Sequence, residues 1–186
     1  MKQNESTLMY VLRLAGTLLL ICAVTAGLLA GVNAITEGAI QERNAAKTQK
    51  AIEAVLPGGF DFEITDFDDP TGLVSRIYQG ENGYAVEVGP PGFDNTITMV
   101  VGIDNEGKVM GISVVSHTET KGLGEVAASG TPKGEAFREQ FVGTTGEVLV
   151  TKDGGQINAI TGATITSRAV CVGVSAAQQC VAGLGK

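Results

Sequence analysis

The sequence predicts an α+β protein, in which one membrane-spanning helix precedes a domain of β-hairpins with packed helices. Three observations predict this class. One long uncharged apolar stretch lies near the N-terminus, two pairs of β-prone runs flank glycine-containing turns, and separate segments have helical composition. Strands that pair in hairpins, with helices outside the strand-rich stretch, are typical of α+β domains.

The apolar stretch runs from Leu14 to Ile35 (LAGTLLLICAVTAGLLAGVNAI) and contains no charged residue. As a helix it is about 33 Å long, and a bilayer core is about 30 Å thick. A buried core helix would normally show a polar face. A cleaved signal peptide, with Val32 and Ala34 at the cleavage site, would normally have a shorter apolar core. We therefore expect a short N-terminal stretch over 1–13 and a transmembrane helix over 14–36. Basic residues nearly balance on its two sides, so charge does not decide its orientation.

A charged, alanine-rich segment follows the span, from Thr36 to Val55. It is expected to continue the membrane helix or to form a separate short helix, within a connector over 37–59. Pro57 and the glycines after it end the helix, because proline cannot continue it. A domain over 60–186 follows, and Phe60, Phe62 and Ile64 alternate as in a short strand.

Two hairpins are expected next, and their turns are marked by Asn82-Gly83 and by the run from Asp104 to Gly107. A helix with Phe137 and Phe141 on one face, a last strand and a C-terminal helix complete the domain. The expected strands are Leu73–Gln79, Tyr84–Val88, Thr96–Ile103, Val109–Val115 and Glu147–Thr151, and the expected helices are Thr131–Val142 and Thr166–Leu184.

Composition excludes several classes of function. With 13 Lys and Arg against 20 Asp and Glu, the chain lacks the cationic surface that nucleic acids require. One histidine and three cysteines, without a CxxC pair, are too few for a histidine-based metal site or an iron–sulfur centre. Cys171 and Cys180 would lie on nearly opposite helix faces, so we expect no disulfide between them. Walker A, GxGxxG and GxSxG motifs are absent from the sequence, so we assign no catalytic or metal-binding residue.

Two segments could carry chemistry. The first, NAITGATITS from Asn158 to Ser167, brings hydroxyls to the start of a helix. Either Thr166 or Ser167 caps that helix, or the helix start binds an anion. In the second case small neighbours leave Thr164 accessible, and Arg168 could add positive charge. The second segment, SHTETKGLGE, follows an apolar strand, and its glycines permit close approach to a ligand or simply an ordinary strand exit.

Taken in order, the anchor, the H-x-E-T-x-G-L-G loop (117–124) and the T-G-A-T-I-T-S motif (161–167) resemble the FMN-binding domain family. The resemblance covers the anchor and nearly all of the remaining chain. It is most specific to the G subunits of Rnf complexes, and the C subunits of the Na⁺-translocating NADH:quinone oxidoreductase are similar.

The resemblance implies a covalent cofactor. In this family a flavin transferase splits FAD and links the FMN phosphate to the last threonine of D-x-x-(S/T)-G-A-T as a phosphodiester. That threonine corresponds to Thr164, while Asn158 stands where the family usually has aspartate. Lys121 stands where the loop usually has proline, and its charge could pair with a phosphate or the flavin. The cofactor-binding residues implied, with weaker expectation for His117, are Thr161, Gly162, Ala163, Thr164, Glu119, Thr120, Leu123 and Gly124.

The implied function is that of a single-pass protein of the cell membrane whose FMN domain faces the extracytoplasmic side. It would exchange electrons with other membrane and redox subunits during ferredoxin:NAD⁺ oxidoreduction coupled to Na⁺ or H⁺ transport. Such a chain is one redox component of a translocase and is not catalytically complete alone. Two alternatives stay open: an FMN-binding module with a sensory or structural role, and the flavin carrier of a non-pumping extracytoplasmic reductase.

Overall fold

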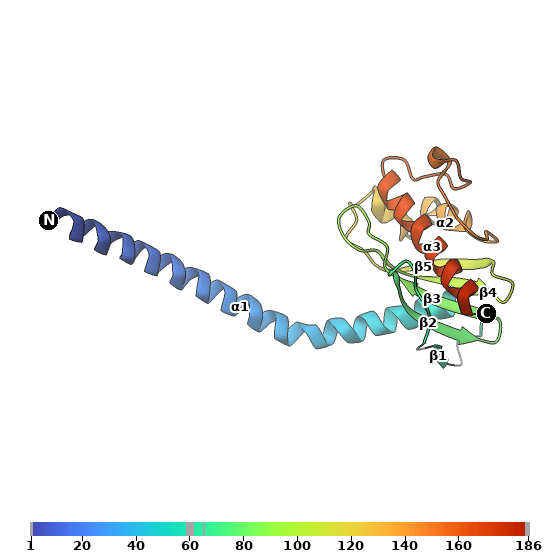
Figure 1. The fold of residues 1–186 in the computed structure, drawn as a ribbon, viewed down its shortest axis with the longest axis horizontal. Coiled ribbons are helices and arrows are strands. Elements are labelled where there is room, and N and C mark those ends of the chain that lie inside the picture. Colours follow the sequence, from blue (N-terminus) through green and yellow to red (C-terminus); the bar gives the residue numbers. More distant parts are fainter. Residues whose placement is uncertain (1, 59–61, 65, 185–186) are drawn as a thin grey trace. The chain divides into compact units, whose positions relative to one another are not determined.

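A computed structural model describes residues 2–58, 62–64 and 66–184 of the chain. Helix α1 (Lys2–Val55) comes first and is followed by a five-stranded sheet, helix α2 (Pro132–Glu139) and helix α3 (Thr164–Leu184) (Figure 1). The chain forms two compact units, Met1–Arg43 and Asn44–Lys186. The α+β class is confirmed.

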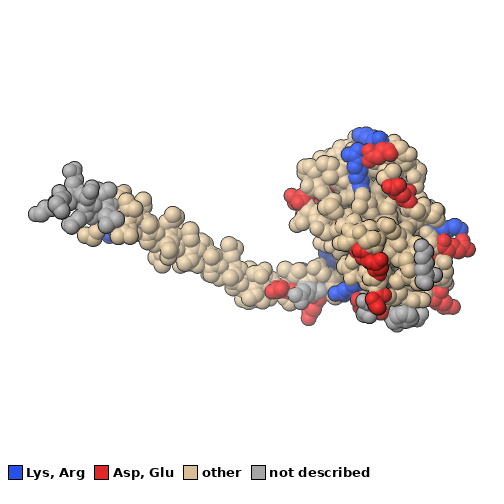
Figure 2. Space-filling view, in the orientation of Figure 1, with Lys and Arg blue, Asp and Glu red and all other residues tan. Residues whose placement is uncertain are grey.

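The first unit contains most of α1, which is helical without interruption, so the segment after the apolar stretch continues the same helix. This is the one helix in the described residues that is long and apolar enough to cross a membrane. Figure 2 shows no acidic or basic residue along most of this stretch. Its hydroxyls are satisfied internally, because Thr17, Thr25 and Thr36 each donate to a carbonyl three or four residues earlier, at 2.6–2.9 Å. A helix with these properties suits a hydrocarbon environment.

The sheet is an antiparallel meander in which neighbours in sequence are neighbours in space. Glu81 and Asn82 form the two-residue loop of the first hairpin, and Gly83 already pairs with Gly80. A β-carbon on Gly83 would lie 2.7 Å from the Cα of Asp104, so this glycine permits close strand pairing. The strands are β1 (Phe62–Ile64), β2 (Val74–Gly80), β3 (Gly83–Val88), β4 (Thr98–Asp104) and β5 (Val109–Ser116). Both expected hairpins are present, and Phe60 lies outside the described residues.

Both faces of the sheet are covered, which explains why β4 is apolar and buried from Met99 to Ile103. Met99 and Val101 pack on the face that carries α3, Phe137 and Phe141. Val100, between them in sequence, points to the opposite face. There it packs against the end of α1, through Ala51, Ile52, Val55 and Leu56.

The segment Glu147–Thr151 is not the expected strand. Val150 makes only an isolated parallel bridge with Ile157, and a 3₁₀ turn, η2 (Thr151–Asp153), follows at once. Instead of a strand, the backbone N–H of Val148 donates to the Ser175 hydroxyl of α3 at 2.8 Å. Leu149 and Thr151 bond through their backbones to Ile157, so the segment does not join the sheet.

The two cysteines of α3 are free and buried, as expected. Burial is the main cause that raises the pKa of the Cys171 thiol to about 12. The Cys180 thiol donates to the carbonyl of Asp68 at 3.3 Å. Because only the thiolate is strongly reactive, we assign Cys171 a structural role.

The contact between α1 and β4 gives a test of this packing. A β-carbon on Gly102 would lie 2.9 Å from both the carbonyl carbon and the Cβ of Val55, and neither atom can move freely. We expect Gly102→Ala to destabilise the domain by about 1–3 kcal/mol, because overpacking must displace the helix end. The measurement is the urea midpoint of the full chain in detergent.

Gly111 provides the matched control, because it pairs directly with Gly102 across the two strands. A β-carbon on Gly111 would meet Val55 at an ordinary 3.8 Å. Gly111→Ala should therefore leave the midpoint unchanged or raise it slightly. Equal midpoints for the two variants would contradict the proposed close contact.

Candidate functional site

The structure brings the two motif segments together around the buried carboxylate of Glu119, which is 6% exposed. One carboxylate oxygen accepts a hydrogen bond from the backbone N–H of Phe93 at 2.8 Å. The other accepts from the hydroxyl of Thr166 at 2.5 Å, a length that suits a hydroxyl donating to a carboxylate. Glu119 therefore joins the β3–β4 connection, the glycine loop and the first turn of α3.

Two glycines leave room for this carboxylate. A β-carbon on Gly124 would lie 2.5 Å from Glu119 Oε2 and 2.6 Å from Thr166 Oγ1. A β-carbon on Gly92 would also overlap the Glu119 side chain. The second glycine of G-L-G is thus required for close packing, not for an unusual backbone angle.

Two similar turns face each other beside Glu119. In Thr120–Leu123 the N–H of Leu123 donates to the carbonyl of Thr120 at 3.1 Å, and Gly122 has a φ of +73°. In the turn 160–163 the N–H of Ala163 donates to Ile160 at 2.9 Å, and Gly162 has a φ of +81°. A positive φ at the third position is typical of type II turns and favours glycine. The Leu123 side chain covers the second turn, 3.0 Å from where a Gly162 β-carbon would lie.

Thr164 is the first residue of α3, two residues earlier than the sequence predicts. The expected capping by Thr166 or Ser167 is wrong, because both hydroxyls bond elsewhere. Ser167 accepts from the N–H of Ile160 at 3.0 Å and donates to the carbonyl of Ala163 at 2.9 Å, while Thr166 donates to Glu119. Thr164 is half-buried, and among the described residues its hydroxyl accepts only a long bond, from the Lys152 ammonium at 3.4 Å.

Thr164 lines a cavity of about 490 Å³, which we call the Thr164 cavity. All but one of the eight predicted binding residues line it. The exception, Thr161, lines two adjoining cavities of about 360 and 230 Å³. His117 and Lys121 line none of these three cavities. The residues that line the Thr164 cavity are Phe93, Glu119, Thr120, Leu123, Gly124, Lys152 and residues 162–166.

Sequence reasoning missed Phe93 and Lys152, both of which line the Thr164 cavity. Phe93 lies far from both motifs in sequence, and Lys152 precedes Asn158 by six residues without belonging to either motif. Sequence reasoning named Arg168 as a cation that could add positive charge near Thr164. Arg168 is held by Asp153 through two bonds of 2.6 Å, and this hydrogen bonding is the main cause that lowers the pKa of Asp153.

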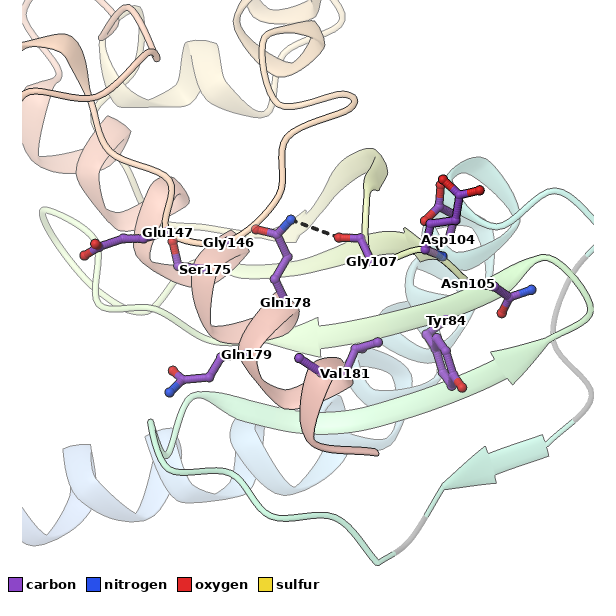
Figure 3. Close-up of a pocket in the computed structure, with 12 residues that line it drawn as sticks. Tyr84, Asp104, Asn105, Gly107, Gly146, Glu147, Ser175, Gln178, Gln179 and Val181 are labelled. Atoms are coloured by element: carbon purple, nitrogen blue, oxygen red, sulfur yellow. Dashed lines mark hydrogen bonds between the residues drawn. The ribbon is translucent and has the colours of Figure 1, made fainter. Parts of the chain in front are cut away.

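A larger cavity, of about 750 Å³, lies elsewhere, at the C-terminal half of α3 (Figure 3). Gln178 lines this cavity, and its side-chain amide donates to the carbonyls of Gly107 and Thr144, at 3.3 and 2.8 Å. The carboxylates among its lining residues, Asp104, Glu106 and Glu147, would repel a phosphate. These negative charges make the cavity unsuitable for FMN. The cavity also includes no residue of either motif.

Comparison with known proteins gives consistent matches over most of the chain. The family model of the FMN-binding domain matches residues 92–179, and that of the RnfG N-terminal region matches residues 1–55. The G subunit of the Na⁺-translocating ferredoxin:NAD⁺ oxidoreductase complex of Acetobacterium woodii is 35% identical over an alignment of 200 residues, gaps included. The alignment covers 95% of this chain and 94% of that protein. The chain belongs to the family of Rnf complex G subunits.

Other Rnf G proteins are similar at somewhat lower identity. The G subunit of the ion-translocating oxidoreductase complex of Methanosarcina acetivorans is 34% identical over 165 residues, covering 83% of this chain and 85% of that protein. The corresponding protein of Vibrio cholerae is 31% identical over 175 residues, covering 85% and 84%. The FMN-binding match begins at Gly92 and so includes all three segments that Glu119 joins.

The Thr164 cavity has the chemistry that FMN requires. Its volume lies within the range of about 300–1,000 Å³ usual for small-molecule sites. Phe93, Leu123 and Ile165 give it apolar walls and are themselves substantially exposed, which suits an aromatic ring. Thr164 and Lys152 give it a hydroxyl and a cation, which suit a phosphate. The residues of this Rnf G family member therefore fit FMN, the group that the matching family model is named for.

The glycine loop gives a stability prediction. Lys121 occupies the second position of the Thr120–Leu123 turn, where the fixed φ of proline is favourable. We expect Lys121→Pro to raise the stability of the folded state by about 0.4–1 kcal/mol, because it restricts the unfolded chain. Urea midpoints would measure the gain, with Lys121→Ala as the control that removes the charge alone. A lower midpoint for the proline variant would show that the turn has another geometry.

The carboxylate hydrogen bond gives a second prediction. Thr166→Val removes the donor and leaves one oxygen of a buried carboxylate without a partner, which costs about 1–3 kcal/mol. Thr161→Val is the matched control, because the Thr161 hydroxyl is exposed, and its change should stay within about 0.5 kcal/mol. If thermal unfolding did not distinguish the two variants, Glu119 would not organise the site as described.

Proposed function

We propose that this chain is a membrane-anchored electron-transfer subunit that carries FMN as a phosphodiester on Thr164. The observation that carries the proposal is which of the motif hydroxyls are hydrogen-bonded within the fold. Thr166 and Ser167 both use their hydroxyls inside the fold, whereas the Thr164 hydroxyl accepts only a long bond from Lys152 among the described residues, and both Thr164 and Lys152 line the Thr164 cavity. Of these three motif hydroxyls, that of Thr164 is therefore the one that a transferase could modify without breaking a short bond of the domain.

Bound FMN supplies one- and two-electron redox chemistry, and the chain's own residues hold it in place. A phosphodiester at Thr164 acts as a tether that prevents loss of the cofactor. Phe93 and Leu123 provide walls for the ring, and Glu119 fixes the backbone that carries them. The turn of Gly162 sets the start of α3 and with it the direction of the Thr164 side chain.

Maturation requires a flavin transferase as a partner. The conformation of Asn158 supports recognition of its side chain by such a second protein. Its backbone N–H donates to the Gln140 side chain at 2.8 Å, and its carbonyl accepts from the same side chain at 3.3 Å. Asn158 is exposed, and its own amide makes no hydrogen bond among the described residues. The side chain at this position is thus available for recognition, and an asparagine holds the same backbone without the family's negative charge.

The relatives support the larger setting. The A. woodii relative is named as part of a Na⁺-translocating ferredoxin:NAD⁺ oxidoreductase complex, and the others as parts of ion-translocating complexes. We infer that this chain works with other membrane and redox subunits of such an Rnf-type complex, coupled to Na⁺ or H⁺ transport. The apolar part of α1 then spans the cell membrane once, and the FMN domain lies on the extracytoplasmic side.

The first test is the intact mass of the full chain, co-expressed with a flavin transferase and denatured before measurement. We expect a gain of one FMN less one water, with the modified peptide containing Thr164. Thr164→Val should remove the entire gain while leaving the stability within about 0.5 kcal/mol, because the hydroxyl supports no strong bond in the fold. Thr161→Val is the control and should keep the modification.

Two results would overturn the proposal. An unmodified wild-type chain, from cells in which a known transferase substrate is labelled, would show that this domain is not an acceptor. Retained flavin in Thr164→Val would place the attachment at another hydroxyl, Thr161 or Thr166.

A further inference from the structure

We propose that Lys152 binds the phosphate that becomes attached to Thr164, so that this acceptor chain supplies a cation for its own flavinylation. The inference rests on the proposed attachment of FMN at Thr164. Its basis is the position of the Lys152 ammonium, 3.4 Å from the acceptor oxygen. A phosphorus atom bonded to that oxygen would bring its other oxygens within reach of the ammonium.

The other cations near the motif either form an ion pair or do not line a cavity with Thr164. Arg168 is bound by Asp153 through two short bonds. Lys133 lines the 360 Å³ cavity, which does not include Thr164. Lys121 lies on the glycine loop outside the three cavities around the motif. Among the described residues, Lys152 is the cation that lines a cavity together with Thr164.

The Arg168–Asp153 ion pair also explains how Lys152 is positioned. Asp153 belongs to the 3₁₀ turn η2, and Arg168 belongs to the second turn of α3. The two bonds of 2.6 Å therefore fasten η2 to the helix whose first residue is Thr164. Lys152, the residue before Asp153, is held at the helix start although its own side chain is exposed.

Lys152 lies where two cavities of different character meet. It lines the Thr164 cavity, with its apolar walls, and also the 230 Å³ cavity formed by Thr151 and residues 158–162 with Thr164. FMN also has two parts of different character, an aromatic ring system and a phosphorylated polyol chain. The apolar walls of the Thr164 cavity suit the ring, and the junction of the two cavities suits the phosphate. The ammonium forms no ion pair within 4 Å in the described structure, although it lies near Asp153 in sequence and influences its pKa.

The reaction explains why a cation is useful at this place. The Thr164 oxygen forms a bond to the FMN phosphorus of FAD, the pyrophosphate bond breaks, and AMP leaves with the bonding electrons. The hydroxyl proton passes to a base of the transferase or to solvent. Negative charge is spread over the phosphoryl oxygens throughout, and a fixed cation beside them lowers the barrier.

The test compares the initial rates of flavinylation of full-length variants in detergent, with purified transferase and FAD, followed by intact mass. Lys152→Met removes the charge at similar length and should slow the reaction about 10- to 100-fold at saturating acceptor. Lys152→Arg should recover most of the rate, because it retains a cation. Lys121→Met and Lys133→Met are the matched controls and should react at the wild-type rate.

A second readout separates electrostatics from structure. Salt screens the attraction between the ammonium and the phosphates, so raising the ionic strength should slow the wild type more than Lys152→Met. The urea midpoint of Lys152→Met should match the wild type, because the side chain contributes no strong bond to the fold.

The outcomes distinguish this inference from the proposed function. A wild-type rate for Lys152→Met, with the wild type fully labelled at Thr164, overturns the role of Lys152 and leaves the attachment site intact. Equal losses in the Met and Arg variants, with lowered midpoints, would show a structural role and overturn it as well. A wild-type chain that takes no flavin would refute the proposed function and this inference together.

Discussion

The buried carboxylate of Glu119 is the interaction on which the candidate site depends. It binds a backbone N–H of the β3–β4 connection and a side-chain hydroxyl of α3, and it belongs itself to the glycine loop. A carboxylate removed from water must have such partners, because an unpaired buried charge is very costly. The three segments are therefore held together by one group, and displacing any of them would leave that group unsatisfied. Gly92 and Gly124 are small because this carboxylate fills the space where their side chains would be.

The sheet is the platform on which these three segments meet. Its two faces are covered by different parts of the chain, the end of α1 on one side and α3 on the other. The same helix that carries the apolar stretch thus ends inside the core of the FMN domain, where Val55 contacts Gly102. Glycine permits a second close approach at Gly173, where a β-carbon would lie 2.9 Å from the Cγ of Pro90. Close packing on both faces limits how far the segments around Thr164 can move.

The hydroxyls of the threonine motif have different tasks, although the sequence presents them as a uniform group. Ser167 closes the turn before α3, and Thr166 satisfies Glu119. Thr164 stands between these residues and the exposed Thr161, at the first position of the helix, with a cation beside it. This division of roles gives a physical reason for the selective modification that we propose. A hydroxyl committed to a buried hydrogen bond is expensive to release, whereas the Thr164 hydroxyl can be modified with little cost to the fold.

The sequence by itself determined the features that arise from local chemistry. An uncharged stretch predicts a membrane helix, alternating runs around glycine turns predict two hairpins, and the motifs place Thr164 and the glycine loop in one site. Tertiary structure decided what depends on contacts between distant segments. It made Glu147–Thr151 a non-strand, because Val148 bonds to α3. It also bound Arg168 to Asp153 and placed Lys152, the neighbour of that aspartate, 3.4 Å from the Thr164 hydroxyl. No local pattern records such a pairing, since its two partners meet only when the chain has folded.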